Sequence, residues 1–312
     1  MNWPFREHRK ILFASVFAFF ALAVLVSYFF LSRIVERQMA ANAEETLKNA
    51  AVSLRAELRK AETVLNGAAV IVENGLEHGT PLEEIQDYIT RLTGALTEAH
   101  GGSVEYVDVY GLFGDNFITG LEWEMAPDYY PRQRAWYAAA ERARGGIGYT
   151  RPYIDIVTGK PVISLAKTLG GNGGAQGVIS LDIDYAAVST FILSLEASSG
   201  GYGMLAGEDF SFFVHPENQR LDRLMEGLNS RYRRLVGKLR SGEAIPMEKI
   251  SNLQGLKVAV FFMRLYNGWY LGIAVPLSVY YRNIYFLISS LSAAGILSMI
   301  FLFLFSRRRP NW

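Results

Sequence analysis

One cation, a group of aromatic residues and two carboxylates fall close together in this sequence. Arg134 and Trp136 lie in a segment that also carries Asp155, and Asp182 follows on an apolar run. A guanidinium binds a carboxylate through paired charge-assisted hydrogen bonds, while carboxylates and phenols accept hydrogen bonds from an ammonium. These residue types could therefore hold the two opposite charges of a small zwitterion. The candidate site residues are Tyr129, Arg134, Trp136, Tyr137, Tyr153, Asp155 and Asp182.

Two other interpretations compete with a zwitterion site. An arginine–aspartate pair among half-buried aromatic residues would give the same pattern in an ordinary α/β domain. Asp155 and Asp182 could also form a catalytic carboxylate pair, but Arg134 beside them is expected to keep both ionised rather than raise the pKa of one. The sequence shows no nucleophile elbow, phosphate loop or metal-ligand cluster. We therefore expect no enzyme activity, no cofactor and no metal.

Two uncharged apolar segments, residues 11–32 and 283–306, bracket the chain. Each is long enough to cross a hydrocarbon core of roughly 30 Å as a helix. The first could alternatively be a cleaved signal peptide, but it is too long for a signal core. Charged residues also separate it from the cleavage-like sequence at residues 41–43. We expect an uncleaved membrane anchor at each end.

Basic residues flank both anchors on one side. Arg9 and Lys10 precede the first segment, and three arginines, residues 307–309, follow the second. Such flanks are typical of the cytoplasmic side of a membrane. Residues 1–10 and 307–312 are therefore expected in the cytoplasm, and residues 33–282 outside it.

The composition agrees with this topology. The net charge is +1, and the middle region carries no basic or acidic block, which gives no indication of a nucleic-acid partner. The sequence has no cysteine, which excludes disulfides and thiolate metal sites. About 250 residues between the anchors can form one large domain or two small ones.

Helical periodicity dominates the start of the middle region. Residues 33–72 contain no proline, and leucines such as Leu47, Leu54 and Leu58 recur at helical steps between charged residues. This pattern predicts a long amphipathic helix that continues out of the first anchor. Its leucine side could pack on the domain, pair with a second copy, or do both. A short helix is expected over residues 81–97.

Strand signals follow in two sets, each rich in β-branched and aromatic residues between glycine-bearing turns. In the strand that carries Asp182, apolar and polar residues alternate, which predicts one core face and one polar face. A strong Asn267-Gly268 turn joins the last two strands. The first set comprises strands at 104–112, 116–119, 147–155, 161–167 and 177–185, with a helix at 131–144. The second comprises strands at 203–205, 211–214, 256–264 and 269–275, with a charged helix at 218–239.

Several of these segments together resemble a known family. The marks are RQRAWY, PYIDIVTGKPVISLA, GVISLDIDY, FFVHPEN and NGWYLGIAVP. The chain is similar, over roughly residues 33–281, to the extracytoplasmic double Cache (dCache) sensor domain of bacterial transmembrane receptors. The resemblance implies an α+β fold: a long N-terminal helix (33–72), then two PAS-like α/β modules with antiparallel sheets, flanked by two transmembrane helices. The membrane-distal module would span about residues 73–195 and the membrane-proximal module about 196–276.

A subset of this family binds free amino acids, and each polar position of its motif has a match here. Arg134 and Trp136 match the pair that holds the ligand carboxylate. Tyr129 matches a tyrosine near the ligand amine, and Asp182 matches the strand aspartate that pairs with the ammonium. Tyr137 completes the motif beside the tryptophan, and Tyr153 and Asp155 match a tyrosine–x–aspartate element. Tyr130 and Ala135 depart from it, where many relatives have aspartate and proline.

The resemblance implies a transmembrane sensor in the bacterial inner membrane. It would bind a free α-amino acid in its distal module and leave that ligand chemically unchanged. A biogenic amine, purine or carboxylate ligand is the alternative, as is a membrane assembly protein with a ligand-free domain. The resemblance also implies a homodimer, which we expect through the leucine side of the long helix. A cytoplasmic effector, such as a chemotaxis, kinase or cyclase module, is expected in a longer gene or as a separate chain.

Overall fold

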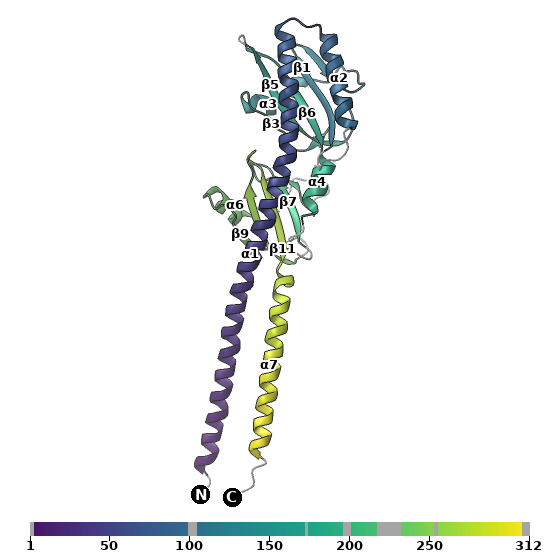
Figure 1. Ribbon diagram of the computed structural model, residues 1–312. Helices are drawn as coiled ribbons and strands as arrows, with labels where there is room; N and C mark the ends of the chain where they lie inside the picture. Colours follow the sequence, from purple (N-terminus) through teal and green to yellow (C-terminus); the bar gives the residue numbers. More distant parts are fainter. Residues whose placement is uncertain are drawn as a thin grey trace.

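The structure is a computed structural model that describes residues 3–98, 105–171, 174–195, 201–216, 232–252 and 255–307. Two antiparallel sheets lie one above the other along a single long helix, and both chain ends lie at the same end of the molecule (Figure 1). We call the sheet farther from those ends the distal sheet and the nearer one the proximal sheet. The predicted α+β fold class, with a long N-terminal helix and two antiparallel sheets, is therefore confirmed.

Helix α1, Trp3–Glu77, runs without a break from the first apolar segment to the far end of the distal sheet (Figure 1). No proline interrupts it after its second residue, and Pro81 stands between it and the next helix, α2 (Leu82–Glu98). The helix extends beyond the predicted residue 72. It thus forms one rigid connection between the apolar end and both sheets.

The leucine side of α1 is packed inside its own chain. Leu47, Leu54 and Leu58 are each at most 1% exposed, and they belong to the core that α1 forms with both sheets. The expectation that this side forms a dimer interface is therefore wrong, because its side chains are already covered. The exposed side of α1 carries other apolar residues, including Val52 (68% exposed) and Val70 (61%).

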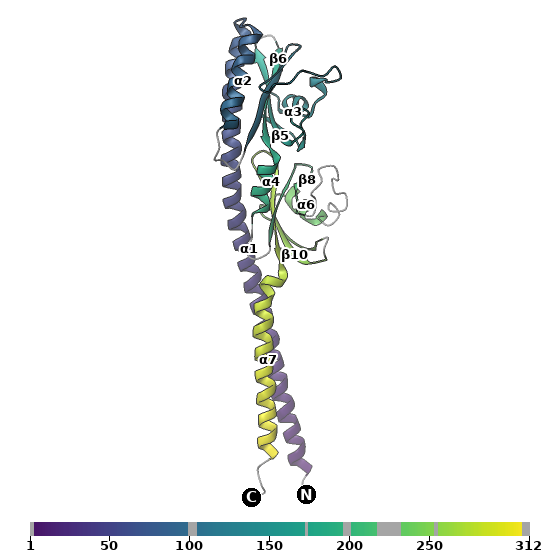
Figure 2. The same cartoon turned by 90° about the vertical axis from the view of Figure 1, so that its right-hand side faces the viewer.

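The distal sheet has the strand order β2-β1-β6-β5-β3, and β4 pairs with β5. Its long central strands confirm the alternation predicted from the sequence. Ile163, Leu165 and Leu181 face the α1 core, while Tyr110 and Ala166 face a second core under α3. Helices α1 and α3 cover opposite faces of this sheet (Figure 2). The strands are β1 (Tyr106–Phe113), β2 (Asn116–Thr119), β3 (Gly148–Tyr149), β4 (Tyr153–Ile154), β5 (Pro161–Gly171) and β6 (Gly174–Asp184).

Two predicted elements of the distal part are divided in the structure. The helix expected at 131–144 is a 3₁₀ turn, Pro131–Gln133, followed by α3, Ala135–Ala143. Arg134 lies between them in an extended conformation, with φ −81° and ψ 154°. The strand expected at 147–155 forms only the short strands β3 and β4, with Pro152 between them, because proline cannot donate a ladder hydrogen bond.

The proximal sheet has the order β8-β7-β11-β10-β9. Both predicted hairpins are confirmed, one pairing β7 with β8 and the other β10 with β11. Strand β9 and helix α4, Tyr185–Leu193, were not predicted, and part of the helix expected at 218–239 lies outside the described residues. The elements are β7 (Tyr202–Ala206), β8 (Phe212–Val214), α6 (Arg233–Arg240), β9 (Met247–Ser251), β10 (Lys257–Arg264) and β11 (Tyr270–Pro276).

Helix α7, Leu277–Arg307, begins directly after β11 and runs beside the first part of α1 (Figures 1 and 2). By length and composition both helices can cross a membrane, with mean hydropathy of 2.3 and 2.0 in their most apolar stretches. They approach closely, since a Cβ added at Gly295 would lie 2.0 Å from the Phe20 ring. The proximal sheet therefore passes straight into the second apolar helix.

Candidate functional site

The predicted site residues gather around one small cavity on the α3 side of the distal sheet. Its volume is about 10 Å³, close to the roughly 10–15 Å³ that holds a single water molecule. The cavity is lined by Asp108, Tyr110, Phe117, Tyr129, Arg134, Trp136, Tyr153, Asp155, Ile156 and Val157. Most of the predicted residues are thus brought together, and Asp182 and Tyr137 lie behind the lining.

Asp182 lies beneath the cavity, on the central strand β6. It is 1% exposed, and its Oδ1 accepts a hydrogen bond from the Tyr110 hydroxyl at 2.9 Å. Its Oδ2 is buried and finds no hydrogen-bond partner among the described residues. Buried carboxylate oxygens are nearly always hydrogen-bonded, so this atom is suited to a donor supplied from the cavity.

Burial dominates the ionisation of Asp182. Removal from water, with further contributions from the negative charges of Asp155 and Asp108, raises the pKa of Asp182 to about 8. The expectation that Arg134 keeps both carboxylates ionised is therefore wrong for Asp182. In the part of the chain that the structure describes, Arg134 forms no ion pair with it, and its guanidinium lies 5.3 Å from the centre of the Tyr129 ring.

Arg134 and Trp136 form the wall of the cavity nearest α3. The break between the 3₁₀ turn and α3 leaves Arg134 as the residue that precedes the helix, half-buried at the cavity. The Trp136 indole nitrogen donates to the Tyr129 hydroxyl at 3.4 Å, a long contact that a better acceptor could replace. Both donors are therefore placed to bind an anionic group.

A hydroxyl network extends across the sheet from Asp182. The Tyr153 hydroxyl lies 2.7 Å from Ser164 Oγ and 3.1 Å from the Tyr110 hydroxyl. Ser164 pairs directly with Asp182 across strands β5 and β6. Asp155 lies at the other side of the cavity, where its Oδ2 accepts from the backbone N–H and the hydroxyl of Thr158, each at 2.7 Å. The network thus holds Tyr153 at the cavity, and Thr158 holds Asp155 there.

The Tyr137 hydroxyl points away from the cavity. It accepts a hydrogen bond from Arg132 Nη1 at 3.0 Å, and the same arginine forms an exposed ion pair with Asp115 at 3.2 Å. The Tyr137 ring packs against Trp136, with ring centres 5.6 Å apart. Tyr137 therefore supports the position of Trp136 and does not line the cavity.

Two polar lining residues, Tyr110 and Asp108, were missed from the sequence, as were the apolar Phe117, Ile156 and Val157. The two polar residues lie on β1, next to β6, and Asp108 pairs directly with Asp182. Burial raises the pKa of Asp108 to about 7. Hydrogen bonds from Thr119, Gly120 and Thr93 stabilise the charged form and partly oppose this rise. The alternation in this strand, which puts Asp108 and Tyr110 on one face, was the signal that could have identified them.

Comparison with curated proteins finds chemotaxis receptors. No protein-family model matches the chain. It is 26% identical over 247 residues to the methyl-accepting chemotaxis protein PctB of Pseudomonas aeruginosa, covering 76% of this chain and 36% of that protein. It is 35% identical over 105 residues to the chemotaxis protein PscA of Pseudomonas syringae, covering 34% of this chain and 16% of PscA. The chain spans about a third of the length of PctB.

Similar solved structures are chemoreceptor ligand-binding domains. The domain of PctB in complex with L-Gln has a TM-score of 0.62 at 23% identity, covering 77% of this chain and 91% of that one. The domain of Pseudomonas fluorescens CtaA in complex with L-leucine has a TM-score of 0.62 at 19% identity, covering 80% of this chain and 99% of that one. The chain has the fold of a double Cache sensor domain. The sequence resemblance to this sensor fold is thereby confirmed.

The raised pKa of Asp182 makes the stability of the sensor fold depend on pH. Folded Asp182 holds its proton up to about pH 8, whereas an aspartate in an unfolded chain loses it near pH 3.9. The folded state therefore binds more protons in this window, and stability falls as pH rises, by up to about 1.4 kcal/mol per pH unit. Asp182→Asn cannot ionise and is expected to flatten the decline.

Thermal denaturation of the wild type and of Asp182→Asn between pH 5 and pH 8.5 measures this effect. Asp87→Asn, at an exposed ion pair on α2, is the matched control and should follow the wild type. Asp108 contributes a smaller decline of the same sign in every variant, because its pKa is raised to about 7. A wild type that gains stability from pH 5 to pH 8 would contradict the assignment.

Proposed function

We propose that the chain is the sensor part of a transmembrane receptor and binds a free α-amino acid in the distal cavity. The unpartnered Oδ2 atom of buried Asp182 is the observation that carries this proposal. Arg134, with no ion pair among the residues that the structure describes, lines the same cavity. One unused buried acceptor and one unused cation match the two charges of an amino acid.

In this proposal the ligand ammonium donates to Asp182 Oδ2 and converts that carboxyl to its ionised form. The ligand carboxylate binds the Arg134 guanidinium and the Trp136 indole N–H, which exchanges its long contact with Tyr129 for a charged acceptor. Tyr110 holds Asp182 in place through its hydroxyl. Burying either ligand charge without a partner would cost several kcal/mol, so the site favours ligands that carry both.

The cavity must enlarge before it can hold an amino acid. Its volume of about 10 Å³ fits no amino acid, so the walls have to move apart on binding. Residues 155–157 form one wall and lie between the short strand β4 and strand β5. Hydrogen bonds of Asp155 with Lys160, Gly159 and Thr158 close this connection into a turn. We therefore expect the turn to move outward as one unit.

The comparisons support sensing rather than catalysis. The curated relatives are chemotaxis proteins, and the solved domains of PctB and CtaA are complexes with amino acids such as L-Gln and L-leucine. Because different amino acids occupy this fold, we expect the charged residues to bind the head group and other wall residues to set the side-chain preference. No group of metal-ligating residues is found in the described ranges.

The proposal places residues 33–282 outside the cytoplasm of a bacterial cell, with α1 and α7 crossing the inner membrane. The distal module would comprise about residues 73–195 and the proximal module about residues 196–276. The two apolar helices that lie side by side, and the chemoreceptor relatives, support this arrangement. A cytoplasmic output module, fused or separate, would receive the signal from the two helices.

A homodimer is part of the proposal, through the exposed side of α1. Val52, Ala56, Thr63, Gly67 and Val70 recur on this side at steps of one or two helical turns, and all are exposed. Small and β-branched side chains at such spacing allow two helices to pack closely. The leucines on the opposite side are unavailable, since they are buried in the chain's own core.

Removing either charged partner should abolish detectable binding. Arg134→Ala and Asp182→Asn each leave one ligand charge unpaired, at a cost of about 3–5 kcal/mol, which is roughly 10²- to 10⁴-fold in affinity. Titration calorimetry against the twenty L-amino acids measures the effect. Arg91→Ala, at an exposed ion pair on α2, is the matched control and should bind as the wild type does. Wild-type affinity in either site variant would refute the assignment.

Cysteine cross-linking tests the dimer, and the chain has no native cysteine to interfere. Single cysteines at Val52, Ala56 and Thr63 should form disulfides between chains in membranes. Cysteines at Leu54 and Leu58 should not, because these positions are buried within one chain. Cross-linking at the leucine positions, or none on the exposed side, would rule out the proposed interface.

A further inference from the structure

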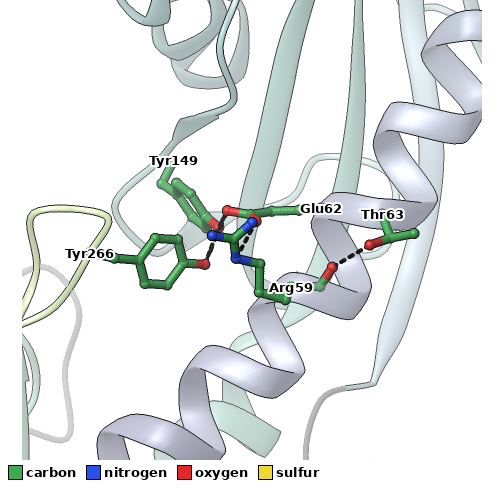
Figure 3. Close-up of polar contacts among 5 residues, drawn as sticks. All are labelled: Arg59, Glu62, Thr63, Tyr149 and Tyr266. Atoms are coloured by element: carbon green, nitrogen blue, oxygen red, sulfur yellow. Dashed lines mark hydrogen bonds and ion pairs between the residues drawn. The ribbon is translucent and has the colours of Figure 1, made fainter.

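A polar junction joins α1, the distal sheet and the proximal sheet (Figure 3). The hydroxyl of Tyr149, on β3, donates to Glu62 Oε1 of α1 at 2.6 Å. The hydroxyl of Tyr266, in the turn between β10 and β11, donates to the same oxygen at 3.0 Å. The two hydroxyls lie 3.1 Å apart. One carboxylate oxygen thus connects three elements that are far apart in the sequence.

The surroundings of the junction hold it in place. The Glu62 side chain is only 13% exposed, and its other oxygen lies 3.5 Å from Arg59 Nε. The Arg59 guanidinium also lies over the Tyr266 ring, 5.3 Å from its centre. The Tyr149 ring packs edge-on against Trp269 of the proximal part, with centres 5.2 Å apart. Burial raises the pKa of Tyr149, so its hydroxyl remains a donor.

A second tether leaves the same segment two residues later. Arg151 forms an ion pair with Asp209, in the turn between β7 and β8 of the proximal sheet. Two residues further on, Tyr153 lines the ligand cavity and belongs to the hydroxyl network above Asp182. Within five residues, therefore, one segment of the chain, from β3 to β4, is attached twice to the proximal part and once to the site.

The segment also has space in which to move. A groove of about 1030 Å³ lies between the two sheets, and Tyr149, Arg151 and Tyr153 all line it. The cavity wall at residues 155–157 follows directly on this segment. If the wall moves outward to admit an amino acid, Tyr153 moves with it, and the strain falls on the contacts of Tyr149 and Arg151.

We propose that residues 149–153 form a coupling segment whose tethers to Glu62, Tyr266 and Asp209 oppose opening of the ligand cavity. Ligand binding then weakens these tethers and releases the turn of the proximal sheet nearest the junction. Because β11 passes directly into α7, and Glu62 lies on α1, the release reaches both apolar helices. This inference rests on the proposed amino-acid binding and adds how that binding is transmitted.

Ligand affinity is the first test, made on the full chain in lipid nanodiscs. Tyr149→Phe and Tyr266→Phe remove a hydroxyl and keep the ring, so each should bind its amino acid roughly two- to tenfold more tightly than the wild type. Tyr88→Phe, a half-buried tyrosine of α2 whose hydroxyl bonds to no described residue, is the matched control. Titration with every amino acid that the wild type binds gives the affinities. Unchanged or weaker affinity in folded variants would overturn the coupling and leave the proposed function standing.

Hydrogen exchange without any amino acid is the second test. Tyr149→Phe should accelerate exchange in the segment 148–157 and also in the distant turn 265–269, while Tyr88→Phe should change neither. A change confined to the substituted strand would overturn the tether. If the wild type binds none of the twenty amino acids, the proposed function fails, and the ligand-coupling role of the tether fails with it. Faster hydrogen exchange in both segments, 148–157 and 265–269, would then show only a structural link between the sheets.

Discussion

A carboxylate buried at the centre of the distal sheet is the constraint on which the rest of the site depends. Asp182 is 1% exposed, and only one of its oxygens has a partner in the described structure. Its neighbour Asp108 and the nearby Asp155 add negative charge, so the empty arrangement favours the protonated acid. A bound cation would reverse this preference. Binding and ionisation are therefore linked at Asp182. Its Oδ1 accepts a hydrogen bond from the Tyr110 hydroxyl, which in turn lies 3.1 Å from the Tyr153 hydroxyl.

The long helix α1 connects the distal site to the proximal sheet and to the apolar end of the molecule. Its leucine side forms a continuous core with both sheets, and Glu62 on the same helix binds tyrosines from each sheet. Close-packed protein interiors are hard to compress and transmit strain. In our proposal, a shift of the distal wall is transmitted along α1 and, through β11, along α7.

The sequence predicted the fold class, the two sheets and the residues that gather around the cavity, because strand alternation and turn residues are local signals. It missed features set by tertiary contacts. Arg134 leaves the helical conformation, and the Tyr137 hydroxyl is drawn outward by Arg132. The leucine stripe looked like an interface, since periodicity reports an apolar face but not which surface covers it. Asp182 was expected to be ionised because burial, which raises its pKa, is not visible in a sequence.

The central claim is that two opposite charges of one ligand meet Asp182 and Arg134. Chemical variation of the ligand tests it most directly. The amino acid that binds best should be titrated beside its decarboxylated amine and its deaminated acid, which share its side chain but carry one charge each. The account predicts that both analogues bind at least roughly 10²-fold more weakly than the amino acid. Equal affinity for either analogue would show that its missing charge has no partner in the site.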